Sequence, residues 1–68
     1  MTTYDRYRVD EITPHLWGRQ ARVNARWAPY PIEGTVWRVQ EAGASYVLSI
    51  GTWKFEAQGD WIVELEAY

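Results

Sequence analysis

The chain has 68 residues, no cysteine and a formal net charge of −2 at neutral pH. This length predicts one small domain over residues 1–68, and the missing cysteines exclude disulfides and disfavour soft-metal sites. The nearly neutral charge favours neither nucleic acid nor a membrane surface as partner. No apolar run approaches the ~20 residues of a membrane span, and no signal peptide is recognisable, so we expect a cytoplasmic or virion-associated protein.

The first half of the chain, residues 1–34, is expected to form strands and loops that cover the second half. Apolar and charged residues alternate within residues 1–10, which predicts a first strand. A proline and a glycine mark residues 11–18 as a loop or a single turn. Leu16 and Trp17 in this loop are expected to cap one end of the core.

The segment from Gln20 to Trp27 has two interpretations. Polar and apolar residues alternate at every position, which predicts a half-buried strand. The alternative is a helix over about residues 14–27, with Thr13 as the N-cap and Pro14 at the first helical position. That helix would pack on the C-terminal strands and give an α+β fold. We favour the strand because Gly18 and a broken apolar stripe count against the helix.

A loop is predicted over residues 28–34, because its two prolines block regular strand pairing. Tyr30 lies between these prolines on a stiff backbone. Its ring either packs back on the rim of the fold or is presented to a partner.

Residues 35–68 predict a four-stranded antiparallel meander. Residues 51–52 fit a two-residue hairpin turn, and residues 58–60 fit a three-residue turn with a bulge. A loop over residues 40–45 joins the first two strands. The registers place these residues opposite one another: Val39 and Tyr46, Trp37 and Leu48, Ile50 and Trp53, Leu48 and Phe55, Ala57 and Trp61, and Lys54 and Glu64.

These registers create one apolar face, with Trp37, Trp53 and Trp61 in the core. The opposite face is expected to be solvated, and it holds Val36, Arg38, Val47, Ser49, Lys54, Glu56, Ile62, Glu64 and Glu66. The predicted fold is therefore all-β, a small barrel or compact sandwich of five or six strands.

Residues 23–39 read VNARWAPYPIEGTVWRV. This arrangement is similar to the first hairpin of Tudor and Src-homology-type small barrels. The resemblance implies a five- or six-stranded barrel, and those families serve mainly as peptide- or nucleic-acid-binding modules. It carries over no site residues, because the aromatic ligand cluster of the Tudor family cannot be placed on this sequence residue by residue. Residues 59–63 look like a turn and strand found in short phage proteins and in cupins, and the composition is typical of compact phage proteins.

No catalytic residue, metal site or cofactor is predicted. No serine can be identified as a nucleophile next to the single histidine, His15, and we interpret this histidine as a surface residue. Glu64 and Glu66 share the outer face of one strand and are interpreted as solubilising. The glycines are spread singly at turns, so no phosphate-binding loop is expected. We therefore expect a protein that is not an enzyme.

The aromatic content predicts a protein-interaction module, since Trp and Tyr are favoured at interface hot spots. It would be a small structural subunit of a larger assembly, phage or viral assemblies included, or a small inhibitor that docks on a larger protein. Its partner would be another protein or a second copy of the chain, and not a membrane. The predicted partner-binding residues are Leu16, Trp17, Tyr30, Arg22 and Arg26.

The alternative function is a nucleic-acid-binding small barrel that uses a patch of arginines at outward strand positions. The predicted patch consists of Arg6, Arg8, Arg22, Arg26 and Arg38. Nearby acidic residues dilute its positive field, and a sequence-independent nucleic-acid binder usually has a basic domain overall.

Overall fold

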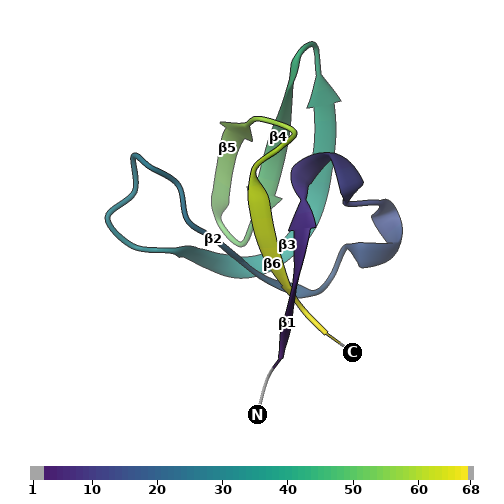
Figure 1. Ribbon diagram of the computed structural model, residues 1–68, viewed down its shortest axis with the longest axis vertical. Helices are drawn as coiled ribbons and strands as arrows, with labels where there is room; N and C mark the ends of the chain where they lie inside the picture. The colour runs from purple at the N-terminus through teal and green to yellow at the C-terminus, as the bar shows by residue number, and fades with distance from the viewer. Residues whose placement is uncertain (1–2, 68) are drawn as a thin grey trace.

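The computed structural model of the protein describes residues 3–67 and contains six antiparallel strands (Figure 1). The strands are β1 (Tyr4–Arg8), β2 (Gln20–Val23), β3 (Ile32–Ala42), β4 (Ser45–Ile50), β5 (Trp53–Ala57) and β6 (Ile62–Glu66). Their order in the sheet is β1-β6-β2-β3-β4-β5. Two 3-10 turns, η1 (Val9–Glu11) and η2 (Pro14–Leu16), connect β1 to β2. The predicted all-β fold is confirmed.

The strand predicted from Gln20 to Trp27 is confirmed for its first half. β2 ends at Val23, and the helix over residues 14–27 is not formed: this segment holds η2 and β2 instead. Leu16, the last residue of η2, and Trp17, which comes directly after it, pack half-buried against the core, as predicted. The described part of the chain contains no helix with the length and apolarity needed to cross a lipid bilayer.

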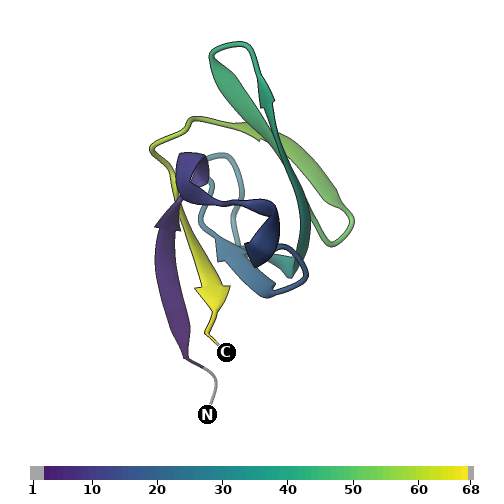
Figure 2. The same ribbon diagram turned by 90° about the vertical axis from the view of Figure 1, so that its right-hand side faces the viewer.

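The sheet curls into two layers because β3 is shared between them. Residues 32–35 of β3 pair with β2, whereas residues 36–42 pair with β4. One layer therefore consists of β1, β6 and β2, and the other of β4 and β5, as Figure 2 shows. In this view the β3–β4 hairpin projects beyond the rest of the molecule.

Aliphatic side chains fill the space between the layers. The largest fully buried ones are Val9, Val23, Val36, Leu48, Ile50, Val63 and Leu65. Apart from Val9 of η1, these residues lie on strands, where alternation directs them to one face, so both layers contribute to a single core.

β6 occupies a position that the meander prediction does not contain. Within residues 3–67 it pairs with β1 and β2 and not with β5, so the meander is correct for three strands and wrong for the fourth. The connection before β6 crosses between the layers. There the Val9 N–H donates to the Trp61 carbonyl at 2.9 Å, and the Asp10 N–H donates to the Gly59 carbonyl at 3.1 Å.

The predicted Lys54–Glu64 pair is wrong for the same reason. Lys54 lies opposite Ser49 on β4. Glu64 lies between Arg6 of β1 and Arg22 of β2.

Of the predicted registers of the two remaining hairpins, one is confirmed and the other is wrong. The β4–β5 register is confirmed, with Ile50 opposite Trp53 across a two-residue turn. The β3–β4 register is wrong by two residues, because Val39 lies opposite Leu48 rather than Tyr46. The loop predicted over residues 40–45 is in fact a turn of residues 43–44, and the strands extend up to it.

A bulge in β3 changes the position of a predicted core tryptophan. The register shifts between Val36 and Arg38, so Trp37 is an extra residue in the strand. Val36, predicted to face outward, is fully buried, whereas Trp37 is 54% exposed. The Trp37 Nε1 donates to the carbonyl of Gly51 at 3.2 Å. The core prediction is therefore wrong for Trp37, because a bulge re-aims the side chains beside it.

The turn before β5 packs directly on β3. The Gly51 N–H donates to the Thr35 carbonyl at 2.9 Å. A Cβ atom placed on Gly34 would lie 3.0 Å from both the Cα and the N of Gly51. A side chain at position 34 would therefore crowd the backbone of Gly51.

We expect Gly34→Ala to lower the free energy of unfolding by about 2–3 kcal/mol, because the added methyl group meets backbone that cannot rotate away. Gly43→Ala is the matched control, since Gly43 has a φ of 66° and no atom within 4 Å of an added Cβ. That change should cost only about 1 kcal/mol of backbone strain. Urea unfolding of both variants measures the difference, and equal costs would contradict the close approach of the two glycines.

Candidate interaction surfaces

The β2–β3 loop, residues 24–31, carries side chains of two adjoining surfaces. Ala25 is buried in the core, and the Ala28 N–H donates to its carbonyl at 3.1 Å. This bond closes a tight turn with Arg26 and Trp27 at its tip. Arg26 lines an open pocket, whereas Trp27 packs against aromatic side chains of β5.

The first surface, here called the aromatic surface, consists of Trp27, Trp53 and Phe55. The Trp27 ring lies 6.2 Å from that of Trp53 and 5.7 Å from that of Phe55, the second contact being edge-to-face at 73°. Trp27 and Trp53 nevertheless remain 55% and 47% exposed. The rings are therefore supported on one side and open to solvent on the other.

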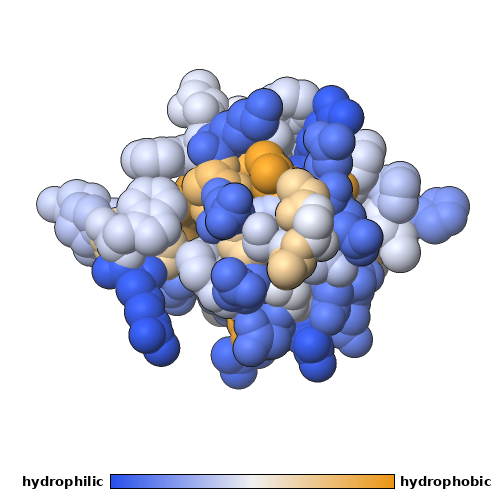
Figure 3. Space-filling view, turned by 90° about the horizontal axis from the view of Figure 1, so that it is seen from above, coloured by the Kyte–Doolittle hydropathy of each residue, from blue (hydrophilic) through white to orange (hydrophobic). Residues whose placement is uncertain are grey.

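Two further observations place this surface in the molecule. Tyr30, on the same loop as Trp27, is 78% exposed, so its ring is presented rather than packed on the rim. The space-filling view shows pale, weakly polar side chains on the left, the side that the β2–β3 loop occupies in Figure 1 (Figure 3). Apolar atoms show between charged side chains nearer the centre of that view.

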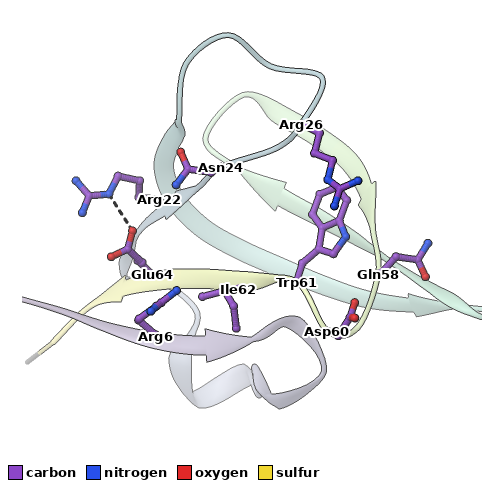
Figure 4. A pocket seen from close by; sticks show the side chains of 9 residues that line it. All are labelled: Arg6, Arg22, Asn24, Arg26, Gln58, Asp60, Trp61, Ile62 and Glu64. Atoms are coloured by element: carbon purple, nitrogen blue, oxygen red, sulfur yellow. Dashed lines mark hydrogen bonds and ion pairs between the residues drawn. The ribbon is translucent and has the colours of Figure 1, made fainter.

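The second surface is an open pocket of about 550 Å³, here called the arginine pocket (Figure 4). It lies between β1, β2, β6 and the connection that precedes β6. Its lining residues are Arg6, Arg22, Asn24, Arg26, Gln58, Asp60, Trp61, Ile62 and Glu64.

Charges of both signs alternate across one side of this pocket. Glu64 lies opposite Arg6 on β1 and opposite Arg22 on β2. The Arg22 Nε is 3.3 Å from the Glu64 Oε1, and the Arg22 guanidinium also lies 4.7 Å from the centre of the Tyr4 ring. Arg22 is therefore held in place by two contacts.

Arg6 and Arg26 differ from Arg22, because within residues 3–67 neither makes an ion pair or a hydrogen bond through its side chain. Both side chains are exposed. Two free guanidinium groups thus border a pocket that also contains Asp60 and Glu64.

The predicted arginine patch is brought together in part. Arg6, Arg22 and Arg26 share the pocket. Arg8 pairs with Asp10 at 2.9 Å and does not line the pocket. Arg38 lies on the part of β3 that pairs with β4, in the other layer.

The predicted partner-binding residues do not form one site. Arg22 and Arg26 line the pocket, and Tyr30 lies on the neighbouring loop. Leu16 and Trp17 lie at the end of η2, a segment on the opposite side of the molecule, to the right in Figure 1. The Trp17 Nε1 is buried and has no hydrogen-bond acceptor among residues 3–67.

Sequence reasoning missed the aromatic surface. It assigned Trp53 to the core and treated Trp27 as the end of a strand, although Trp27 directly precedes a proline-containing loop. The position of Trp27 next to this loop was the signal in the sequence for its exposure. Trp61, also predicted as core, is half-buried against the core and at the same time lines the arginine pocket.

Within residues 3–67, no group of three or more His, Asp or Glu side chains is arranged to hold a metal ion. Comparisons of the chain with protein-family models, with curated proteins and with solved structures gave no match.

We expect Trp27→Ala to cost about 1 kcal/mol of stability, because the ring loses two aromatic contacts but is already half exposed. Leu48→Ala, at a position with 0% exposure, should cost about 2–5 kcal/mol. Thermal unfolding followed by circular dichroism compares the two variants. A Trp27→Ala cost as large as that of Leu48→Ala would show that this ring belongs to the core.

Proposed function

We propose that the protein is a non-enzymatic protein-interaction module that binds its partner through the aromatic surface, together with Tyr30 and Arg26. The observation that carries this proposal is the pair of contacting, half-exposed rings of Trp27 and Trp53. Large aromatic side chains left this open next to a free arginine have the composition of an interface hot spot, where Trp, Tyr and Arg are enriched.

The support beneath these side chains favours binding. Trp27 is held by Trp53 and Phe55, and its loop is fixed by the buried Ala25. A side chain that is already ordered loses little conformational entropy when a partner covers it. The Arg26 guanidinium, free of partners within residues 3–67, then donates charge-assisted hydrogen bonds to a carboxylate of the partner.

Both roles suggested by the sequence, a subunit of a larger phage or viral assembly and a small inhibitor, use a surface of this kind. A cytoplasmic or virion-associated location goes with them. Leu16 and Trp17 are half-buried against the core, so we assign the anchoring role to Trp27, Tyr30 and Trp53 instead.

The test compares partner capture by three forms of the immobilised protein in an extract of the source organism. Wild type and His15→Ala, an exposed change on η2, should capture the same protein. Trp27→Ala combined with Tyr30→Ala should lose it. Titration calorimetry with the identified partner should show at least about tenfold weaker binding for the double variant. Equal affinity of all three forms would refute the proposal.

Nucleic-acid binding is the second candidate, because Arg6, Arg22 and Arg26 gather at one pocket. Asp60 and Glu64 in the same pocket oppose a polyanion, and Arg22 is already paired. We therefore rank it second.

We expect no gel shift of single- or double-stranded oligonucleotides at low salt, because the pocket combines free arginines with carboxylates. A shift that disappears as salt rises would instead indicate phosphate contacts and the release of counterions. Arg6→Ala with Arg26→Ala identifies the source of any such shift, since these two arginines lack partners among residues 3–67.

A further inference from the structure

β5 is a terminal strand of the sheet, and one of its edges is open. It pairs with β4 on one side, and no segment within residues 3–67 pairs with its other side. An open edge presents backbone N–H and C=O groups that can pair with another strand.

The hairpin register determines which backbone groups point to that open side. The two-residue turn makes Ile50 and Trp53 a hydrogen-bonded pair, and such pairs alternate along an antiparallel ladder. Phe55 therefore directs its N–H and C=O toward β4. Lys54 and Glu56 direct theirs toward the open edge.

The side chains of Lys54 and Glu56 are also without partners. Both are exposed, and neither makes an ion pair within residues 3–67. Their neighbours on β4 are Ser49 and Val47, which carry no charge. The open edge thus carries one unpaired positive and one unpaired negative charge, two residues apart on the same face.

We propose that β5 pairs antiparallel with β5 of a second copy of the chain, about a two-fold axis that passes between the two Phe55 residues. Lys54 then lies opposite Glu56 of the second copy, and Glu56 opposite its Lys54. Trp53 lies opposite Ala57, a large side chain beside a small one. The outward backbone groups of Lys54 and Glu56 exchange hydrogen bonds across the axis, and the sheet continues through both copies.

Charge complementarity selects this register. A two-fold axis between two antiparallel copies of one strand passes midway between one residue and its own symmetry mate. Centring on Lys54 or on Glu56 would bring like charges face to face, which is destabilising. Centring on Phe55 pairs opposite charges at two places and brings two half-buried phenyl rings together.

The other terminal strand, β1, lacks this complementarity. A two-fold pairing centred on Arg6 places two guanidinium groups opposite each other. Asp5 lies opposite Leu65, on the face of the sheet that packs on the core. Asp5 itself is exposed, and a two-fold pairing centred on it would bring two carboxylates face to face.

This inference goes beyond the partner-binding proposal, because it names a second copy as the occupant of the β5 edge. The two proposals fail separately. A protein that stays monomeric but binds a partner through Trp27 and Tyr30 overturns only the inference, and Tyr30→Ala should leave the dimer intact.

Sedimentation velocity of the purified protein, from about 1 µM to about 1 mM, tests the inference. Wild type should form a dimer. Lys54→Glu alone and Glu56→Lys alone should each weaken the dimer about tenfold or more, because like charges then face each other twice. The combined variant, Lys54→Glu with Glu56→Lys, should restore wild-type dimerisation.

A mixture of the two single variants should also dimerise, since each supplies the charges that the other lacks. Circular dichroism confirms that each variant is folded. A wild type that is monomeric throughout, a dimer indifferent to both single changes, or single variants that neither the mixture nor the combined variant rescues would each overturn the proposal.

Discussion

The placement of β6 between β1 and β2 is the constraint on which the rest of the structure depends. This strand contributes Val63 and Leu65, both fully buried, to the middle of one layer. It joins the two ends of the chain, and its pairing extends to a hydrogen bond from the Ala67 N–H to the Thr3 carbonyl at 2.8 Å. Without it, β1 and β2 would have no neighbour in common and the first layer would not form.

The same placement creates both the arginine pocket and the open edge of β5. Because β6 brings Glu64 between Arg6 and Arg22, arginines far apart in the sequence meet at one pocket. Because β6 leaves β5 without a second neighbour, that strand keeps an open edge and its aromatic side chains stay accessible. The arginine pocket and the open edge of β5 therefore both result from the pairing of β6 with β1 and β2.

The pairing of β6 is also the part of the fold that the sequence does not predict. The β4–β5 hairpin was predicted correctly, since a Gly-containing two-residue turn fixes its register locally. A glycine turn before β6 suggested another hairpin, but hydrogen bonds from Val9 and Asp10 hold that connection to the N-terminal half. Alternation along a strand shows which face is buried, but it does not identify the neighbouring strand.

The candidate sites were likewise predicted only in part. Alternation placed Arg6, Arg22 and Arg26 outward, and all three line the pocket. Alternation also grouped Arg8 with them, but η1, which starts directly after it, supplies Asp10 as its local partner. A bulge has no clear signature in a single sequence, so the exposure of Trp37 could not be foreseen.

The core explains why aromatic side chains are left at the surface. The largest fully buried residues are all Val, Leu or Ile, which fit the narrow space between two short layers. A domain of this size has few interior positions, and tryptophans beyond those positions must lie at the surface. Exposed rings have a cost in water, and contacts among Trp27, Trp53 and Phe55 offset only part of it. Covering the remaining exposed area with another protein surface would remove it from water, and this burial is the driving force of the interaction that we propose.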